Sequence, residues 1–397
     1  MRMNFGLLAL SVGAFGIGVT EFAPMGLLPV IAKDLGVSIP AAGLLISAYA
    51  LGVLVGAPLM TLTTGRVPRR ALLIALAGIF TLGNLLAAVS DGYGMLLAAR
   101  LLTSFNHGAF FGVGSLVAAS LVASDRRASA VAAMFMGLTI ANVVGVPLAT
   151  WAGEHLGWRA SFWGIAGLGV ATMAALRLTL PPLPAPEAGN SLAELRVLAR
   201  PRVLGALALT VVGSSAMFTV FTYIAPILRE ATHASQGFVT AMLVVYGLGL
   251  TLGNWLGGRF ADRSVDRTLI VTLAALSAIL VAFAWAMPMA APSAVLIFLW
   301  GVASFALVPP LQVRVMRAAA DAPNLASSVN IGAFNLGNAI GAALGGGVIA
   351  AGLGYPAVSL AGAATSFVGL AAVVFTTWRG PATEVAPGSP SADLALD

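Results

Sequence analysis

The feature that most constrains this chain is a series of twelve apolar stretches, each about 20 residues long or longer, separated by short polar connections. An α-helix needs about 20 consecutive apolar residues to cross the hydrocarbon core of a bilayer. The stretches lack the alternation of a membrane β-barrel and are too long for its strands. We therefore predict an all-α membrane protein with twelve transmembrane helices, at residues 5–31, 40–64, 71–90, 94–122, 129–152, 160–180, 203–228, 236–258, 268–288, 293–316, 325–350 and 356–378.

Composition argues against a soluble protein of this length. Of the 397 residues, 59% are hydrophobic and only 9% are charged, whereas about a quarter of a soluble domain is charged. The net charge of +6 does not indicate a nucleic-acid partner, because the arginines stand in short clusters between the apolar stretches and not along one face. The chain has no cysteine, which excludes disulfides, thiolate metal sites and cysteine nucleophiles. We expect no metal and no cofactor.

The positions of the basic residues predict the orientation. If the N-terminus is inside the cell, the outer loops contain only Lys33, Arg159 and Arg229. Loops on the cytoplasmic side of membrane proteins carry an excess of Lys and Arg, so both termini are expected to be cytoplasmic in an inner membrane. In this topology the cytoplasmic arginines are Arg66, Arg69, Arg70, Arg126, Arg127, Arg196, Arg200, Arg202, Arg259, Arg263, Arg267, Arg314 and Arg317.

One long polar connection, from Pro181 to Pro201, predicts the boundary between two halves. Within it, Ser191 and Glu194 have the spacing of a capping box, which predicts a short surface helix. The segment after Arg379 is rich in Pro, Ser and Ala, which is typical of disorder. We therefore predict a six-helix half at 1–180, a cytoplasmic connector at 181–202, a second six-helix half at 203–378 and a disordered cytoplasmic tail at 379–397.

An internal repeat supports the division into halves. Two motifs recur at a shift of 197 positions: Tyr49-Ala50-Leu51-Gly52 corresponds to Tyr246-Gly247-Leu248-Gly249, and Gly157-Trp158-Arg159-Ala160 to Gly354-Tyr355-Pro356-Ala357. A repeat of six spans in the same orientation predicts a binding site at the interface of the halves. Further matches at this shift are Gly56 with Gly253, Leu59 with Leu256, Arg66 with Arg263, and Arg70 with Arg267.

Several short motifs follow one another along these spans. The loop after the eighth span, Gly258 to Arg267, contains a glycine, the acid Asp262 and basic residues. Its first-half copy has Gly65 where the acid belongs. The other motifs are Thr20-Glu21-Phe22 followed by Pro29 and Asp34, Leu96-Leu97-Ala98-Ala99-Arg100, Gly145-Val146-Pro147, and Gly157-Trp158-Arg159 before Phe162.

In this order the motifs resemble those of the major facilitator superfamily, over about residues 5 to 378. The branch they resemble is the drug:proton antiporters, similar to bacterial sugar-efflux, arabinose-efflux and chloramphenicol-resistance permeases. The resemblance implies two pseudo-symmetric six-helix halves and export by antiport, the latter associated with Gly145 and Pro147. It departs from the family pattern at Thr103-Ser104 and at Ala149-Thr150.

The resemblance also implies a conformational latch at the two cytoplasmic loops. In the family such a loop joins neighbouring helices through an ion pair and a helix end. We expect Asp262 to matter more than any residue at the position of Gly65, because only the second loop retains its acid. The alternative for the first-half loop is that its arginines serve only to set the orientation of the chain in the membrane. The residues assigned to the two loops are Arg66, Arg69, Arg70, Gly258, Asp262, Arg263 and Arg267.

Charged side chains deep in a membrane cost about 2.5–3.5 kcal/mol on insertion scales and are usually functional. Glu21 is the one acid well inside a predicted span, about 15 Å of helix from its outer end. Arg100 and His107 lie seven residues apart in the fourth span, on the same side of the helix. Loss of water favours a neutral carboxyl group and a nearby cation favours the carboxylate, so these three residues are candidates for proton coupling. The alternatives are a static Glu21–Arg100 bridge and a packing or substrate-contacting role for His107.

Polar and aromatic residues at membrane depth are weaker candidates for lining a substrate cavity. They could bind a polar solute, or they could bond between helices, which contributes about 0.6 kcal/mol each and needs no substrate. Trp285 belongs either to the cavity or to helix packing. The cavity candidates are Asn106, Asn142, Tyr223, Trp300, Asn335 and Asn338.

The function that fits best is secondary active export by alternating access, driven by the proton gradient. The exported solute is expected to be small and amphiphilic or sugar-like, and the protein is expected to act as a monomer in the lipid bilayer. Proton-coupled uptake by a symporter is the alternative. A membrane-embedded enzyme or a sensor is more remote, because the spans hold no partnered serine nucleophile motif and the connections offer no soluble output domain.

Single cysteines introduced into this cysteine-free chain test the topology. When an impermeant thiol reagent is added to intact cells, we expect Lys33→Cys to be labelled and cysteines within 185–195 to be protected. The reason is that the reagent reaches only the outer loops. Rapid labelling within 185–195 combined with protection at position 33 would mean that the orientation is reversed.

Overall fold

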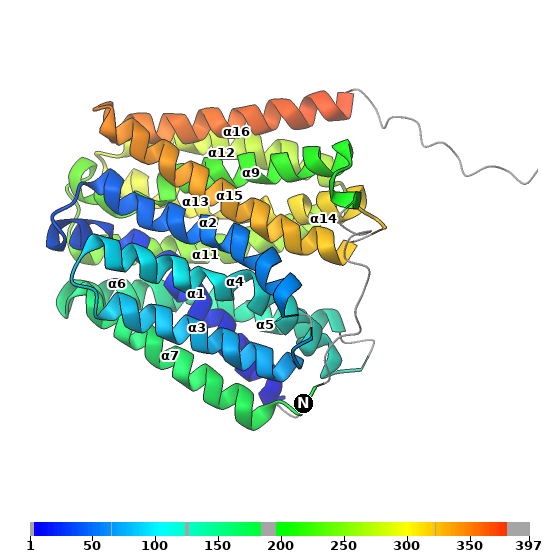
Figure 1. Ribbon diagram of the computed structural model, residues 1–397. Coiled ribbons are helices and arrows are strands. Elements are labelled where there is room, and N and C mark those ends of the chain that lie inside the picture. Colours follow the sequence, from blue (N-terminus) through cyan, green and yellow to red (C-terminus); the bar gives the residue numbers. More distant parts are fainter. Residues whose placement is uncertain (1–3, 65, 124–126, 184–195, 322, 379–397) are drawn as a thin grey trace, which may run out of the picture.

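The twelve predicted spans are confirmed by a computed structural model (Figure 1), in which twelve helices are long and apolar enough to cross a membrane. The structure describes residues 4–64, 66–123, 127–183, 196–321 and 323–378. Ser191, Glu194, Gly65, Arg126 and the tail at 379–397 lie outside the described residues. The first half comprises α1 (Phe5–Asp34), α2 (Ile39–Thr63), α3 (Arg69–Ala88), α4 (Tyr93–Ser120), a fifth span made of α5 (Arg127–Ile140), η2 (Ala141–Gly145) and α6 (Val146–His155), and α7 (Trp158–Thr179).

The second half repeats this order. Its seventh and tenth spans are broken, the seventh by a turn after Phe221 and a π-helical end, and the tenth at Leu307 before Pro309 and Pro310. The elements are α9 (Pro201–Phe221), α10 (Ile224–Pro226), η3 (Ile227–Ala231), α11 (Gln236–Ala261), α12 (Val265–Ala286), α13 (Ala290–Ala306), α14 (Val308–Ala318), α15 (Pro323–Ala350) and α16 (Gly354–Trp378).

Local sequence sets several helix starts. Asn4 accepts hydrogen bonds from the backbone N–H groups of the first turn of α1. Ser38, Ser235 and Ser264 cap α2, α11 and α12 in the same way. A side-chain oxygen at this position satisfies a backbone donor that the helix itself leaves unpaired. These caps fix where the spans begin, and the apolar runs between them supply the membrane-crossing length.

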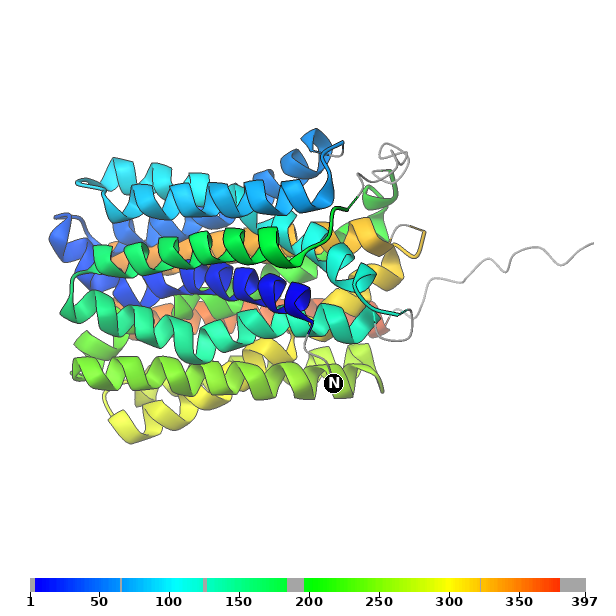
Figure 2. The same cartoon turned by 90° about the horizontal axis from the view of Figure 1, so that it is seen from below.

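The long helices run side by side across one bundle in both views (Figures 1 and 2). Because consecutive spans alternate in direction, α1 begins and α16 ends at the same end, called here the connector face, together with the start of α9. The opposite end, called the far face, holds Asp34 and the start of α7. One apolar core lies within the first half and a second lies mainly within the second half.

The repeat seen in the sequence is also present in the backbone. Gly36 and His233, which are 197 positions apart, both adopt positive φ angles, of 63° and 52°. Gly157 and Gly354, at the same shift, have φ angles of 90° and 79° and precede the last span of each half. His233 is the notable member, because residues other than glycine rarely adopt this conformation. The two halves therefore share turn geometry even where the residue type has changed.

Close helix contacts repeat as well. Gly56 packs against the backbone of Phe105, and Gly253, its counterpart, packs against the backbone of Val302. In both halves this brings the second span of the half directly onto the fourth. Small residues permit such close approach, which replaces the hydrophobic driving force that is missing between helices in lipid.

The outer surface of the bundle is apolar, as a lipid-facing surface must be. Leu178 is 84% exposed and Trp285 is 78% exposed. The alternative that placed Trp285 in a cavity is therefore wrong in this structure. Trp300, in contrast, is buried.

The two halves meet along two pairs of helices. α2 lies against α15, where Ser47 Oγ donates a hydrogen bond to the carbonyl oxygen of Ala339 at 3.2 Å. α11 lies against η2 and α6, where Gly247 approaches the carbonyl group of Asn142. At the far face, the buried carboxylate of Glu154 forms an ion pair with Arg229 of the other half, at 2.6 Å.

The close contact of α11 with α13 gives a stability prediction. A Cβ at Gly253 would overlap the carbonyl oxygen of Val302, which is backbone and cannot rotate away. We expect Gly253→Ala to lower the free energy of unfolding by the ~1–3 kcal/mol typical of overpacking, which is measured as a lower midpoint of thermal unfolding in detergent. Gly258→Ala on the same helix is the control, because no atom lies within 4 Å of a Cβ there. A Gly253→Ala protein as stable as the control would contradict the contact.

Candidate functional site

Glu21 lies buried in α1, about 20 Å of helix from the end at Asp34. Its side chain is 9% exposed, and its Oε2 is 3.9 Å from Nδ1 of His107. Arg100 and His107 are likewise buried in α4, 1% and 4% exposed. The structure therefore brings the three predicted proton-coupling residues into one cluster between α1 and α4.

Arg100 takes partners that the sequence did not predict. Its Nη1 donates to the carbonyl oxygen of Thr20 at 2.7 Å, and its guanidinium carbon lies 4.1 Å from the centre of the Tyr49 ring. Arg100 and Glu21 interact electrostatically, but among the ion pairs of the described residues Glu21 is joined to His107 and not to Arg100. The static Glu21–Arg100 bridge is absent from this arrangement. Arg100 Nε and Nη2 are buried without a hydrogen-bond partner.

His107 stands between two oxygen atoms. Its Nδ1 lies 3.1 Å from the hydroxyl oxygen of Tyr49 and 3.9 Å from Glu21 Oε2. Its ring packs against Phe111, which stacks on Phe135 with ring centres 5.0 Å apart. Tyr49 was not among the predicted site residues, although its place in the repeated Tyr-x-Leu-Gly motif was a signal that could have found it.

A second set of bonds holds the α1 segment in place. Thr20 Oγ1 donates to Asn84 Oδ1 at 2.7 Å, and Asn84 Nδ2 donates to the carbonyl oxygen of Phe80 at 2.8 Å. Thr20 thus bonds to α3 through its hydroxyl and to Arg100 of α4 through its carbonyl. These bonds join the backbone next to Glu21 to both α3 and α4.

The second half has uncharged residues where the first half has its three buried ionisable residues, and aromatic rings lie around one of them. At the shift of 197, Glu21 corresponds to Phe218, Arg100 to Ile297 and His107 to Ser304. Phe22 of the first half contacts Phe218 and Phe221, with ring centres 6.1 Å apart in each pair. Tyr246 stacks on Phe221 and contacts Trp300. The buried indole Nε1 of Trp300 has no hydrogen-bond partner.

The other cavity candidates fall into two groups. Tyr223 and Asn142 lie at the interface of the halves: Tyr223 Oη donates to the Ala342 carbonyl beside Gly43, and Asn142 Nδ2 donates to the Leu138 carbonyl. Asn338 accepts a hydrogen bond from Ser214. The bonds of Tyr223 and Asn338 fit the interhelical alternative, whereas the bond of Asn142 lies within its own span. Contact of these residues with a solute stays a prediction.

Asn335 and Asn106 both carry unpaired buried atoms. Asn335 Nδ2 donates to the Ile331 carbonyl, whereas its Oδ1 has no partner. Asn106 has no partner for either amide atom, and it lines a void of about 10 Å³ inside the first half, enclosed by α1, α3, α4 and α7. Asn106 therefore faces the interior of its own half and not the interface between the halves.

Gly145 and Pro147 lie where the fifth span changes from π-helical to α-helical geometry. A Cβ at Gly145 would overlap the Val19 side chain, so α1 approaches the fifth span closely at this point. Irregular helix geometry of this kind often marks functional positions. Here it lies within one turn of the Glu21 segment of α1 and next to the interface with α11.

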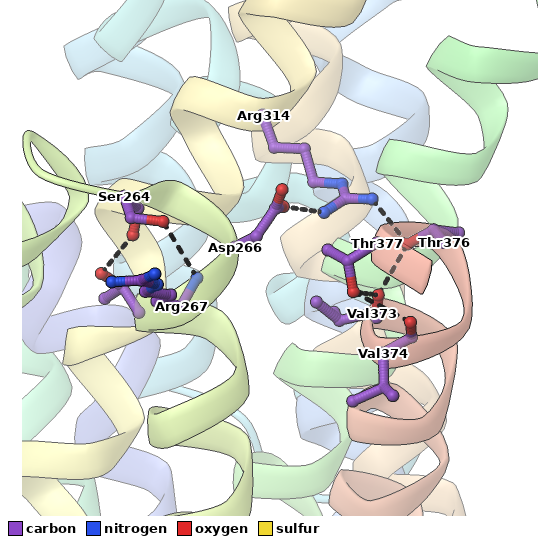
Figure 3. A network of polar contacts seen from close by, with 9 residues as sticks. Ser264, Asp266, Arg267, Arg314, Val373, Val374, Thr376 and Thr377 are labelled. Carbon is purple, nitrogen blue, oxygen red and sulfur yellow. Dashed lines mark hydrogen bonds and ion pairs between the residues drawn. The ribbon is translucent and has the colours of Figure 1, made fainter. Parts of the chain in front are cut away.

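The two connector-face loops differ from the expected latch. Asp262 is exposed at the end of α11 and forms no ion pair among the described residues. The acid that forms one is Asp266, in the first turn of α12: its Oδ1 accepts from Arg314 Nη1 at 2.6 Å, and Arg314 Nη2 reaches Thr376 Oγ1 at 2.9 Å (Figure 3). Arg314 therefore joins α12, α14 and α16.

Of the remaining loop residues, Arg70 bonds to a neighbouring helix and most of the others are exposed. In the first half, Arg70 donates to the carbonyl oxygen of Arg177, which joins α3 to α7. Arg66, Arg263 and Arg267 are exposed, and a Cβ at Gly258 would meet no neighbour. Arg69 has a buried Nε without a partner. Action of either loop as a latch stays a prediction.

At the far face, the signature before the sixth span forms a compact anchor. Asp34 Oδ2 accepts hydrogen bonds from Trp158 Nε1 at 2.9 Å and from Arg159 Nη1 at 2.7 Å. Arg159 Nε also donates to the carbonyl oxygen of Ser90. The ends of α1 and α3 are thereby tied to the start of α7.

Comparison with known proteins agrees with this architecture. The family model described as Major Facilitator Superfamily matches residues 10–327 and also residues 207–393. The chain is 57% identical to the inner membrane transport protein YdhP of Escherichia coli (strain K12), over 96% of this chain and 98% of the relative. It is 33% identical to a chloramphenicol resistance protein of Streptomyces lividans, over 85% of this chain and 88% of the relative.

A solved structure shares the fold at low sequence identity. It is the crystal structure of a bacterial homologue of the human lysosomal transporter Spinster, in an inward-facing and unoccupied conformation. The TM-score is 0.64 at 15% identity, with 95% of this chain and 96% of that chain covered.

The ion pair of Arg314 predicts that, of the two acids between the eighth and ninth spans, Asp266 contributes more to stability and transport than Asp262. We expect Asp266→Asn to lower the free energy of unfolding by ~0.5–1 kcal/mol, since the pair is partly exposed, and to slow transport. Asp262→Asn, a matched loss of charge four residues earlier, should leave thermal stability unchanged. Thermal unfolding in detergent and turnover in proteoliposomes measure the two effects. A larger effect at position 262 would instead favour the latch expected from the sequence.

Proposed function

The chain belongs to the major facilitator superfamily, as a multi-pass transporter of the inner membrane, and we propose that it is a proton-coupled antiporter that exports small amphiphilic or sugar-like solutes. The connector face is then the cytoplasmic side. The name of the Streptomyces relative, a chloramphenicol resistance protein, supports export of an amphiphilic solute. The resemblance of the Thr20-Glu21-Phe22 segment to the sugar-efflux branch supports the sugar-like alternative.

The observation that carries this proposal is the buried carboxyl group of Glu21 with two basic residues beside it. It pairs with His107 at 3.9 Å, while two donors of Arg100 lack an acceptor. A carboxylate would be stabilised by turning toward those donors, and a neutral carboxyl group would not. Gain or loss of a proton by Glu21 can therefore change its partner and, with it, the packing of α1 against α4.

The solute is proposed to bind on the other side of α1. Phe22 points toward Phe218 and Phe221 of the second half, next to Tyr246 and Trp300. Aromatic faces suit the apolar part of an amphiphile, and the unpaired indole N–H of Trp300 offers a donor to a polar group. Adjacent residues of α1 thus serve the proton and the solute, which gives the two a shared element.

Alternating access requires the halves to separate at one face at a time. The Glu154–Arg229 ion pair joins them at the far face, and α2 is bonded to α15 through Ser47. Opening toward the outside would break the first of these contacts. Hydration of both charges after they separate offsets much of their lost attraction, because burial of the pair had removed that hydration.

Glu21→Gln tests the proton site. The variant keeps the size and hydrogen-bonding capacity of the side chain but cannot ionise. We expect it to abolish accumulation against a gradient in proteoliposomes with an imposed proton gradient. Downhill exchange of solute should survive, because rocking of the halves needs no net proton release.

Two further variants serve as comparisons. Arg100→Ala should reduce both activities and stability, because removing one member of a buried charged cluster costs about 3–5 kcal/mol. His107→Gln should be milder, changing the pH dependence of export without eliminating it. If the Glu21→Gln protein still accumulates solute against its gradient, Glu21 is not the coupling site, and His107 or Asp34 becomes the better candidate.

A further inference from the structure

Tyr49 touches both basic residues of the charged cluster from a third helix, α2. Its side chain is 1% exposed. Its hydroxyl oxygen lies 3.1 Å from His107 Nδ1, and its ring lies 4.1 Å below the guanidinium carbon of Arg100.

Close packing of α2 on α4 holds Tyr49 in this position. Gly52 lies against the Ser104 side chain, and Gly56 lies against the backbone of Phe105. A side chain at either glycine would push α2 away from α4. Because Tyr49 precedes these contacts on the same helix, its hydroxyl has little freedom to leave the His107 ring without a movement of α2.

The chemistry of His107 Nδ1 makes this contact sensitive to a proton. The titratable and charged groups facing His107 are Glu21 from α1, Tyr49 from α2 and Arg100 from its own helix. A phenol is neutral near pH 7, so its O–H can donate only to an unprotonated Nδ1. Once Nδ1 carries a proton, it becomes a donor, and the carboxylate of Glu21 is a stronger acceptor than a phenol oxygen.

The same helix also reaches the other half. Ser47, two residues before Tyr49, donates to the Ala339 carbonyl of α15 at 3.2 Å, and Leu54 contacts Gly332. α2 is thus bonded to the proton site at Tyr49 and to the second half at Ser47. A change at the first bond has a direct mechanical route to the second.

We propose that Tyr49 is a positioning residue that couples the proton site to the interface between the halves, an inference that rests on the proposed proton-coupled function. Its hydroxyl donates to Nδ1 and holds neutral His107 in the Nε2–H tautomer. When a proton binds to the Nδ1 lone pair, the bond between α2 and α4 is exchanged for a bond from Nδ1–H to Glu21. α2 is then free to move with α15.

The repeat supplies a matched control. Tyr246 is the counterpart of Tyr49, and its hydroxyl donates to Ser304, the counterpart of His107, at 3.4 Å. Serine does not titrate in the physiological range, so this contact cannot respond to a proton. Tyr246→Phe therefore removes the equivalent hydroxyl without touching the proton site.

Nitrogen NMR of ¹⁵N-histidine-labelled protein in lipid nanodiscs tests the tautomer. The chain has only three histidines, His107, His155 and His233, so removing the last two by His→Asn replacement assigns the signals. At a pH well above the titration of His107, we expect wild-type Nε2 to carry the proton and Nδ1 to be bare. An Nδ1–H tautomer in the wild-type protein overturns the proposal without reference to any variant.

Tyr49→Phe then tests the coupling. It retains the ring under Arg100 and removes only the hydroxyl, so a mixture of tautomers should appear. The pH midpoint of export should rise by about half a unit or more, because loss of the donor destabilises only the neutral ring. Tyr246→Phe should leave both the tautomer and the midpoint unchanged, whatever it does to turnover.

The outcomes separate this proposal from the function on which it rests. A Tyr49→Phe protein with the wild-type tautomer and pH profile overturns the role of Tyr49, even if Glu21→Gln abolishes accumulation. Accumulation of solute by the Glu21→Gln protein, together with a changed tautomer in Tyr49→Phe, overturns the role of Glu21 and leaves the Tyr49–His107 contact established.

A double variant tests the route through α2. Adding Ser47→Ala to Tyr49→Phe should not change the pH midpoint of export any further if both residues act through α2. An additive shift of the midpoint would contradict that route.

Discussion

Inside a bilayer no water is available to the backbone, so every N–H and C=O group of a spanning segment needs a partner within the protein. Twelve helices meet that requirement here, and where a helix is interrupted the backbone lies inside the bundle. The π-helical segment η2 is covered by α1 and α11, and the turn between α9 and α10 is buried around Tyr223. These two irregular segments therefore lie at the interface of the halves, whereas the break at Leu307 lies within the second half.

Helix association in lipid gains little from apolar burial, and close contact of small residues replaces it. Gly52 and Gly56 bring α2 onto α4, and Gly253 brings α11 onto α13. This tight packing gives the buried side chains fixed distances. It places the Tyr49 hydroxyl oxygen 3.1 Å from His107 Nδ1, the contact on which the proposed coupling of α2 to α4 rests.

The two halves share a backbone plan but differ in the chemistry at equivalent depth. The first half carries Glu21, Arg100 and His107, whereas the second carries Phe218, Ile297 and Ser304 at the corresponding positions. Under the proposed function, the charged cluster of the first half and the aromatic cluster of the second half serve the proton and the solute as separate sites that share α1. The proposed coupling between these sites then runs through the packing of α1 and α2, and it requires no direct contact between proton and solute.

The sequence by itself determined the fold class, the twelve spans and the repeat. The thickness of the bilayer sets the length of the apolar runs, and duplication of a half sets the constant shift between matching residues. Both signals can be read along the chain without any knowledge of contacts. It also singled out Glu21, Arg100 and His107, because charges at membrane depth are rare. Only the tertiary structure decided which partners they take. Glu21 lies by His107 and not in a bridge with Arg100, Tyr49 enters from α2, Asp266 and not Asp262 holds Arg314, and Asn106 faces its own half. These pairings depend on helix rotation and on distances of a few ångströms between segments far apart in sequence, which the period and composition of the chain do not encode.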